Sequence, residues 1–475
     1  MSVPTRRRAG APPVGRRDDL ALAIDRAAGA QPIAGNQLEH YAHSPSALDA
    51  MVSQIAAARR WVHFENYIIR DDATGRRFAA ALIERARAGL PVRVLYDALG
   101  SLGTSHRYWR ALAQAGVEVR PFHPLLTRHL TELLSRDHRK LLVTDGTRAM
   151  LGGLCIGDEW AGDPARRRHP WRDTMVAVTG PAAAAFDRVF ARIWRRVGDP
   201  LPPDQAVTDP EPQGTSTARV VEGEPGRARV YRAVQLLAAT ATRRLWITDA
   251  YLIPPAPLYA SLLDAARGGV DVRLLVPGTS DLPVLRSATR GGYRQLLRAG
   301  VRIFEYQGPM LHAKTLLVDQ RWARVGSSNL NVSSLLTNYE LDLVAECEHL
   351  TGELAAQFHR DLAASREIVL EPRRGPLPAR LVGTPAAASQ VPTAPHRRSS
   401  YEVGAVAVVA LRRVAGGLRR PVAGTAALAC LGAGALLLVV PRLMGIVFAT
   451  GAFLLAIALG MYALERRRAR DVDDG

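Results

Sequence analysis

Two short stretches decide the fold: residues 137–145, DHRKLLVTD, and residues 312–319, HAKTLLVD. Both follow the pattern H-x-K-x4-D, and in both a glycine lies 14 positions after the histidine, at Gly152 and Gly326. The Leu-Leu-Val run behind each lysine is typical of a buried β-strand. Because residues two apart on a strand point to the same face, each histidine is expected to project together with its lysine.

The two lysines of these stretches are the only lysines in the chain. The sequence has 62 basic residues, and all except Lys140 and Lys314 are arginine. Lysine is a compact charge with three rotatable donors, whereas arginine presents a wide planar fork. Lysine at these two places therefore indicates a functional site rather than a general preference for positive charge.

The two motifs lie in two repeated parts of the chain. Residues 60–97 and 244–277 each show an apolar β-like run, a helix rich in Ala, Leu and Arg, and a second β-like run. An Ala-Gly-Val sequence then follows in each part. Strands that alternate with helices indicate an α/β fold. The same order in both parts predicts two duplicated halves, at residues 19–198 and 227–383.

Phosphoryl transfer is the chemistry that these residue types favour. If the halves pack about a pseudo-two-fold axis, His138 and His312 meet at one site with both lysines. One imidazole can attack phosphorus, and the other can give a proton to the leaving oxygen. The lysines, with donors at Gly153, Ser327 and Asn329, would bind the phosphate and stabilise its developing charge. The predicted catalytic set is His138, Lys140, Asp145, His312, Lys314 and Asp319.

The motif pair resembles that of the phospholipase D superfamily, which is defined by two copies of HxKxxxxD. More narrowly, the chain resembles bacterial cardiolipin synthases of the B type, which lack the N-terminal membrane helices of the main type. The resemblance covers roughly residues 38–378. Besides the motifs it is carried by Phe64-Glu65-Asn66-Tyr67, Asp97-Ala98-Leu99-Gly100-Ser101, Gly152-Gly153, Trp171-Arg172-Asp173, Asp249-Ala250-Tyr251, Pro254 and Asn338-Tyr339-Glu340.

The resemblance implies αβα sandwich halves, a phosphatidyl-histidine intermediate, and transfer of the phosphatidyl group to an alcohol without a metal or other cofactor. It also implies that Asp173 and Glu340 orient the histidines, each serving the histidine of the opposite half, as the third residue of a triad does. One position departs from the family, which has Asn where this chain has Cys155. That change alters substrate geometry or slows turnover, or Cys155 is a small buried thiol and the remaining donors suffice.

The C-terminal part differs in kind from the rest. Residues 421–440 and 443–464 contain no charged residue. About 20 helical residues span the hydrocarbon layer of a bilayer, so we predict a transmembrane hairpin at residues 421–464. Arginines flank both of its ends, and the positive-inside rule then puts both ends and the catalytic body on the cytoplasmic side of the bacterial inner membrane. The remaining predicted segments are a basic disordered tail (1–18), a linker (199–226), a flexible basic linker (384–420) and a cytoplasmic tail (465–475).

Two further segments have open interpretations. The basic loop at residues 166–169, RRRH, either catches an anionic lipid headgroup or is an ordinary solvated loop. The first half also has an apolar insert around residues 121–135. This insert either dips into the membrane or forms a surface helix packed on its own half.

The predicted function is that of a membrane-tethered phosphatidyltransferase, a cardiolipin synthase that converts two phosphatidylglycerol molecules to cardiolipin and glycerol. The expected partners are phospholipids, namely phosphatidylglycerol or phosphatidylethanolamine, and the membrane. Water as the acceptor would instead make the protein a phospholipase D that releases phosphatidic acid. The pI near 10.7 raises a nuclease as another alternative, but much of the excess charge lies in the tail and the hairpin flanks, so no nucleic acid is expected. A degenerate membrane-binding protein, motivated by Cys155, is a third alternative.

Overall fold

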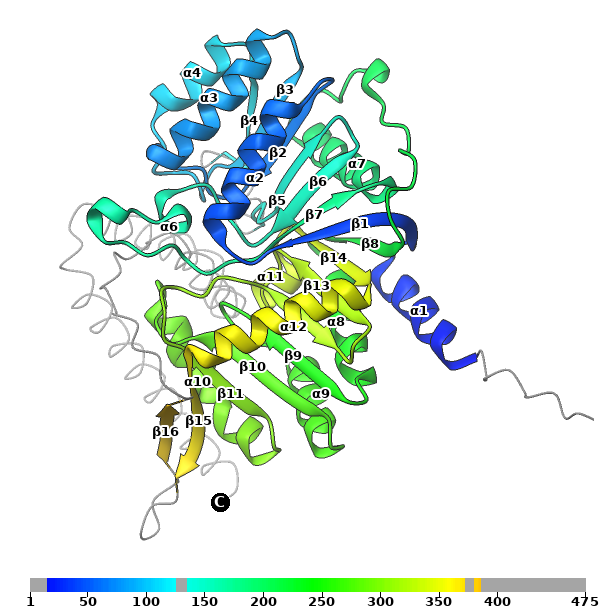
Figure 1. Cartoon of the computed structure of the whole chain (residues 1–475), viewed down its shortest axis with the longest axis vertical. Helices are drawn as coiled ribbons and strands as arrows, with labels where there is room; N and C mark the ends of the chain where they lie inside the picture. Colours follow the sequence, from blue (N-terminus) through cyan, green and yellow to red (C-terminus); the bar gives the residue numbers. More distant parts are fainter. Residues whose placement is uncertain (1–14, 125–134, 372–379, 386–475) are drawn as a thin grey trace, which may run out of the picture. The chain divides into compact units, whose positions relative to one another are not determined.

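The computed structural model describes residues 15–124, 135–371 and 380–385, all of which belong to one compact unit (Figure 1). One mixed sheet of 16 strands runs through this unit. From one edge to the other, the strand order is β16-β15-β11-β10-β9-β12-β13-β14-β8-β1-β7-β6-β5-β2-β3-β4.

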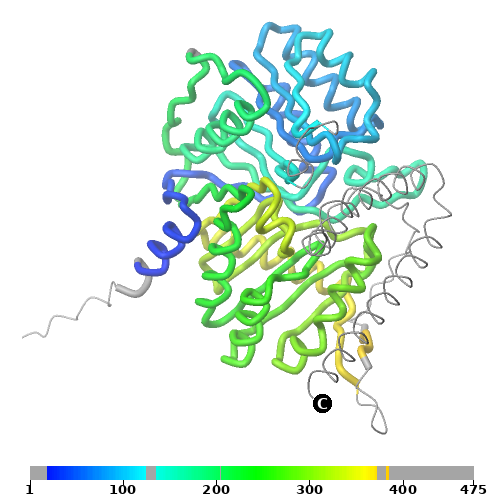
Figure 2. The backbone as a smooth tube through the Cα atoms, turned by 180° about the vertical axis from the view of Figure 1, so that it is seen from behind, coloured from blue at the N-terminus to red at the C-terminus, as the bar shows by residue number. Residues whose placement is uncertain are grey.

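The strand order is symmetric about the centre of the sheet. There β1 and β8 pair antiparallel, with Ile33 opposite Ala218. Counted outward from this pair, β7, β6, β5, β2, β3 and β4 on one side correspond to β14, β13, β12, β9, β10 and β11 on the other. This is the order of two copies of one unit related by a two-fold axis, and it confirms the predicted α/β fold with two duplicated halves. Figures 1 and 2 show the first half in blue to teal and the second in green to yellow, from two sides.

The strands of the first half are β1 (Ile33–Tyr41), β2 (Val62–Asn66), β3 (Val92–Asp97), β4 (Glu118–Phe122), β5 (Lys140–Thr144), β6 (Arg148–Gly152) and β7 (Met175–Thr179). Those of the second half are β8 (Ser216–Gly223), β9 (Arg244–Thr248), β10 (Asp271–Pro277), β11 (Arg302–Tyr306), β12 (Thr315–Val318), β13 (Trp322–Gly326), β14 (Glu340–Glu346), β15 (Ser365–Glu371) and β16 (Arg380–Pro385).

Helices cover both faces of the sheet. One core cluster combines α7 (Pro181–Arg196) and α12 (Glu348–Ala363) with strand residues of both halves. On the opposite face, α2 (Ser44–Ala57), α3 (Ala73–Arg87) and α4 (His106–Gln114) cover the first half, while α1 (Gly15–Ala28), α8 (Arg229–Thr240), α9 (Ala256–Arg267) and α10 (Pro283–Arg298) cover the second. The short helices are α6 (Asp158–Ala161), α11 (Val332–Leu336), η1 (Pro164–Arg166) and η2 (Pro203–Gln205).

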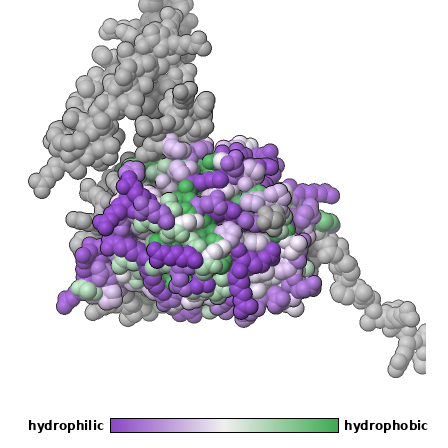
Figure 3. All heavy atoms as spheres, turned by 90° about the horizontal axis from the view of Figure 1, so that it is seen from above, coloured by the Kyte–Doolittle hydropathy of each residue, from purple (hydrophilic) through white to green (hydrophobic). Residues whose placement is uncertain are grey.

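Alternation along the motif strands explains the two faces. Leu141 and Val143 of β5 belong to the cluster with α7 and α12, whereas Leu142 between them belongs to the cluster with α2, α3 and α4. A strand buried on both faces has to be apolar at every position, as the Leu-Leu-Val runs are. On the surface, Figure 3 shows one face on which hydrophilic side chains surround a smaller hydrophobic area.

Three predicted boundaries need correction. The segment 199–226, expected to be a linker, contains β8 at the centre of the sheet. The strand was not predicted because its short apolar run, Val220–Val221, lies in a segment rich in Pro, Glu and Gly. Residues 15–18 of the segment expected to be a disordered tail belong to α1, which begins at Gly15. The second half extends past residue 383, because β16 pairs with β15 through Pro385.

Several predictions concern residues outside this description. The transmembrane hairpin at 421–464, its flanking segments and most of the apolar insert lie outside the described residues. Within the ranges that the structure describes, no helix is long and apolar enough to cross a bilayer.

Candidate active site

The two motif histidines lie just before their strands rather than within them. β5 begins at Lys140 and β12 at Thr315, so each histidine occupies an extended segment at the strand entrance. The backbone N–H of His138 donates to the carbonyl of Tyr339, at 2.9 Å, and that of His312 donates to the carbonyl of Arg172, at 2.7 Å. Each motif is therefore tied by its main chain to the opposite half.

The residue after each of these carbonyls supplies a carboxylate to the same histidine. Nδ1 of His138 lies 3.0 Å from Oε1 of Glu340, and Nδ1 of His312 lies 2.7 Å from Oδ2 of Asp173. All four side chains are buried. The structure thus brings the four residues into two matching pairs, each formed between the halves.

The carboxylates define what the imidazoles can do. When Nδ1–H donates to a carboxylate, Nε2 keeps a lone pair that can attack phosphorus or accept a proton. When the ring is protonated, the same carboxylate stabilises the imidazolium. Aromatic rings border both histidines: Tyr67 lies 4.9 Å from His138, and Trp160 lies 5.6 Å from His312, between ring centroids.

Both lysines are fully buried and held by their own motifs. Nζ of Lys140 donates to the carbonyl of His138 at 2.5 Å and lies 5.0 Å from the centroid of the Tyr67 ring. Nζ of Lys314 donates to the carbonyl of His312 and lies 2.9 Å from its Nδ1. The two buried lysines balance the two buried carboxylates, so an entering phosphate anion adds a negative charge that protonation of a histidine can balance.

Burial shifts the titration of the histidines downward. Burial lowers the pKa of His312 to about 3, with the charge of Lys314 as the next contribution, although Asp173 opposes the shift. Burial also lowers the pKa of His138, against the opposing effect of Glu340 and in the same direction as Lys140. Both rings are therefore neutral at pH 7, and a bound phosphate anion would raise both pKa values.

The two carboxylates stay ionised. Burial by itself raises the pKa of Asp173, but the charge of His312 and the hydrogen bond to it prevail and lower that pKa to about 2. The pKa of Glu340 falls to about 2 in the same way, because its interactions with His138 outweigh burial. Each carboxylate thus acts as a permanent negative partner of its histidine.

The expected phosphate-binding residues divide into two kinds. The N–H of Gly153 donates to the carbonyl of Thr174, at 3.1 Å, and a Cβ at Gly153 would lie 2.2 Å from Oδ1 of Asp173. The hydroxyl of Ser327 donates to Glu340. These two residues therefore position the carboxylates instead of offering free donors. Asn329 is different: its buried Oδ1, an acceptor, has no hydrogen-bond partner among the described residues, and the N–H groups of its side-chain amide are the donors that a phosphate could use.

The two motif aspartates lie at the far ends of their strands. Asp145 follows β5 with φ 58° and accepts from the backbone N–H groups of Arg59, Arg60 and Trp61. Asp319 follows β12 with φ 54° and accepts from the backbone N–H groups of residues 242–244, at the start of β9. At about 3.3 Å per residue, the strand carries Asp145 roughly 20 Å from His138. The expected catalytic role is corrected: both aspartates anchor the motif strand to its neighbour.

Cys155 is buried at 1% exposure among the apolar residues under α2 and α3. Burial raises the pKa of its thiol, although the charge of Lys140 opposes the shift. A neutral, packed thiol fits the interpretation of Cys155 as a small core residue. Slower turnover from the missing amide stays a prediction.

Sequence reasoning missed other polar residues that support the site. Asp97, at the end of β3, accepts from the guanidinium of Arg136 at 2.8 Å and from the backbone N–H of Asp137 at 2.9 Å. It thereby holds the segment that leads to His138. Asp249 accepts from the backbone N–H of Leu330, at 2.8 Å, and steadies the loop behind Asn329. Asp97 is the last residue of β3, and Asp249 directly follows β9. Both lie in the short stretches that resemble the family, and this was the sequence signal that could have identified them.

The basic loop keeps both of its interpretations. Arg166, Arg167, Arg168 and His169 are exposed, and Asp163 closes the loop by accepting from the N–H of Arg166. The loop leads into Trp171, whose ring centroid lies 5.8 Å from that of His312.

The described part of the chain contains no group of three or more His, Cys, Asp or Glu side chains that could hold a metal ion. The expectation of a cofactor-free reaction stays a prediction.

The fold and the site define a class of protein: a duplicated α/β enzyme with one site built from two H-x-K motifs, as in the phospholipase D superfamily. The family model described as "Cardiolipin synthase, PLD-like domain" matches residues 51–194 and 235–362, one match in each half. The chain therefore belongs to the cardiolipin synthase family of phospholipase D-like proteins. It is an enzyme, a phosphatidyltransferase of that superfamily.

Individual relatives agree with the family model. The chain is 36% identical over 348 residues to cardiolipin synthase A of Pseudomonas aeruginosa, covering 72% of this chain and 70% of that protein. It is 34% identical over 340 residues to the cardiolipin synthase of Halalkalibacterium halodurans, covering 70% of this chain and 66% of that protein. The narrower resemblance to the B type stays a prediction, since the Pseudomonas relatives carry the name cardiolipin synthase A.

A solved structure shares the fold. The crystal structure of phosphatidylserine synthase from Haemophilus influenzae superposes with a TM-score of 0.58, covering 74% of this chain and 92% of that one. At 14% sequence identity this likeness concerns the fold alone.

Proposed function

We propose that the protein joins two phosphatidylglycerol molecules to give cardiolipin and glycerol through a covalent phosphatidyl-histidine. The observation that carries this proposal is the pair of buried histidines, each held through Nδ1 by a carboxylate of the opposite half. Two equivalent imidazoles in one site suit a two-step transfer, because one can form the covalent bond while the other moves the proton.

In the first step, Nε2 of His138 attacks the phosphorus of phosphatidylglycerol. The P–O bond to the glycerol headgroup breaks, and the leaving oxygen takes a proton from Nε2 of His312. His312 has that proton because the negative charge of the bound phosphodiester raises the lowered pKa of the ring. Lys140, Lys314 and Asn329 stabilise the charge on the non-bridging phosphoryl oxygens.

In the second step, a hydroxyl of another phosphatidylglycerol attacks the phosphatidyl-histidine. Neutral His312 accepts the hydroxyl proton, the new P–O bond forms, and the P–N bond to His138 breaks. Free His138 is restored and His312 is protonated again, so the cycle closes without a cofactor. Glu340 and Asp173 keep both rings in the orientation that presents Nε2 throughout.

The proposal includes the membrane. Both substrate and product are lipids, and the uncharged runs at 421–440 and 443–464 are long enough for a transmembrane hairpin. The arginines around them favour a catalytic body on the cytoplasmic side of the inner membrane. Cysteine-accessibility labelling of the loop at residues 441–442 in intact and permeabilised cells would test this topology; protection from an impermeant reagent in intact cells would contradict it.

Product analysis tests the reaction itself. Purified protein in mixed micelles with labelled phosphatidylglycerol should form cardiolipin and release glycerol in a 1:1 ratio. Phosphatidic acid as the main product would favour hydrolysis, and release of acid-soluble fragments from DNA would favour a nuclease. Normal cardiolipin formation by a His138→Ala, His312→Ala double variant would refute the proposed chemistry.

A further inference from the structure

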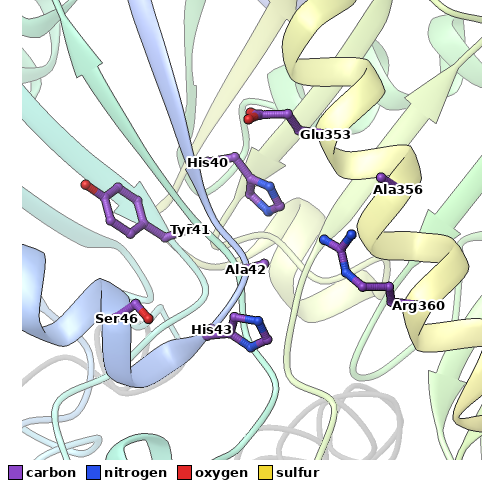
Figure 4. Close-up of a pocket in the computed structure, with 8 residues that line it drawn as sticks. All are labelled: His40, Tyr41, Ala42, His43, Ser46, Glu353, Ala356 and Arg360. Carbon is purple, nitrogen blue, oxygen red and sulfur yellow. The ribbon is translucent and has the colours of Figure 1, made fainter.

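A second cleft, of about 440 Å³, lies at the seam between the halves and contains none of the motif residues. One wall is the end of β1 and the first turn of α2, and the other wall is α12. Its lining residues are His40, Tyr41, Ala42, His43, Ser46, Glu353, Ala356 and Arg360 (Figure 4).

Both walls of this cleft supply hydrogen-bond donors. Figure 4 shows the rings of His40 and His43 and the guanidinium of Arg360 directed toward the same space. Nε2 of His40 is buried and has no partner among the described residues. Nε and Nη2 of Arg360 donate to Oε1 of Gln357, at 2.9 and 2.6 Å, which fixes the guanidinium at the edge of the cleft.

The electrostatics of the cleft favour an anion. Burial lowers the pKa of His40 to about 3, and the positive charges of Arg172, Arg360 and His43 lower it further in that order. Arg172 is itself paired with Asp361, at 2.9 Å, yet its charge still acts on His40. The start of α2 adds the positive end of a helix, and its cap residue His43 makes no side-chain capping bond.

One acidic group, Glu353, also lines the cleft and comes from the same helix as Arg360 (Figure 4). Glu353 of α12 has a buried Oε2 without a hydrogen-bond partner in the described part of the chain, and its Oε1 lies 3.6 Å from Nε2 of His349. A carboxylate and a donor cluster in the lining of one cleft suit a ligand that carries an anion and, a few bonds away, a hydroxyl or amino group.

We propose that this cleft is a second phosphate-binding site, which takes a phosphate ester with its phosphate on His40, His43 and Arg360 and its hydroxyl or amino group on Glu353. A phospholipid headgroup and a soluble phosphate ester share this chemistry. The site is independent of the phosphatidyl transfer proposed above, because no motif residue contributes to it.

The test is calorimetric titration of the full chain in detergent with sn-glycerol 3-phosphate, inorganic phosphate and short-chain phosphatidylglycerol, each as a separate arm. A His138→Ala background prevents turnover and leaves any binding at the catalytic site equal in all proteins compared. Into it are introduced His40→Gln, Arg360→Gln and the control Arg267→Gln, an exposed arginine on α9.

The parent and the Arg267→Gln control should show one binding event more than the His40→Gln and Arg360→Gln variants, or the cleft variants should bind at least tenfold more weakly. Binding of the soluble ester at the cleft assigns a soluble ligand, and binding of the lipid alone assigns a headgroup. Identical isotherms in all four proteins would overturn the proposal. If His40→Gln lowers the melting temperature, the binding measured for Arg360→Gln decides between the outcomes. Arg360 is exposed, so its substitution leaves the core intact.

Discussion

Asp173→Asn separates the charge of the carboxylate from its shape. Oδ2 of Asp173 lies 2.7 Å from Nδ1 of His312 and 3.0 Å from Nε1 of Trp160, and Oδ1 accepts from the N–H of Thr174. The amide oxygen of an asparagine at the Oδ2 position can still accept from His312 and from Trp160, with its NH2 group at the Oδ1 position. The ring is then held as before, but the negative charge that stabilises its imidazolium form is lost.

The size of the effect follows from the lost charge. Two unit charges about 4 Å apart interact by about 4 kcal/mol at an effective dielectric constant near 20. Since about 1.4 kcal/mol corresponds to a tenfold change in rate, kcat should fall roughly 10³-fold. KM should change little, because Asp173 acts on the imidazolium of the transition state rather than on the substrate.

The assay is the initial rate of cardiolipin formation from phosphatidylglycerol over a range of substrate concentrations. Asp187→Asn is the matched control, because Asp187 lies 2.7 Å from Nδ1 of His63 in an equally buried pair outside the site. This control should keep kcat within a few-fold of the parent value even if it lowers the melting temperature. A kcat for Asp173→Asn within tenfold of the parent in folded protein would refute the reasoning.

Three further predictions concern the motifs and stability. Lys140→Arg and Lys314→Arg should lower kcat at least 100-fold, because a guanidinium does not fit where the buried Nζ meets its own histidine carbonyl; initial rates measure this. Asp145→Ala should lower the free energy of unfolding by about 2 kcal/mol in urea titrations, because it removes the acceptor of several backbone N–H groups. The kcat of this variant should stay within a few-fold of the parent value. Stability should fall as pH drops from about 6.5 toward 3, in urea titrations at stepped pH.

The sign of the pH effect follows from the depressed pKa values. Between pH 6.5 and 3, His312 is protonated in the unfolded chain but not in the folded chain, so acid favours unfolding. Asp173 and Glu340 extend the loss from their ordinary pKa values, near 4, down to about 2. His312→Gln should flatten the upper part of this window. Arginine variants that are as stable in urea as the parent and keep the parent kcat would contradict the first of these predictions. A free energy of unfolding that does not change with pH would contradict the third.

Much of the site could be predicted because short stretches of the sequence contain its reacting side chains. The H-x-K spacing and the apolar run behind it place a histidine and a lysine at a strand entrance, whatever the rest of the chain does. The duplicated order then brings the two entrances together, and the motif-like strings around Asp173 and Glu340 point to the partners across the interface. These features depend on short stretches of sequence, so tertiary context cannot conceal them.

Other features depend on contacts that no local pattern reveals. β8 is buried by β1 and β14, and its own composition resembles a linker. Asp145 lies in the motif but points to backbone N–H groups 84 to 86 residues earlier in the chain. Likewise, Gly153 and Ser327 lie beside the site, yet their donors are used by Thr174 and Glu340. Which partner a donor finds is a property of the fold rather than of the motif.

The central claim is that both halves build a single active site, and the activities of His138→Ala and His312→Ala measured separately test it most directly. A composite site needs both rings in every turnover, so each single variant should lose at least 10³-fold in the rate of cardiolipin formation. Two independent sites would instead leave each single variant about half of the parent rate. Half-activity in both folded variants would contradict the account.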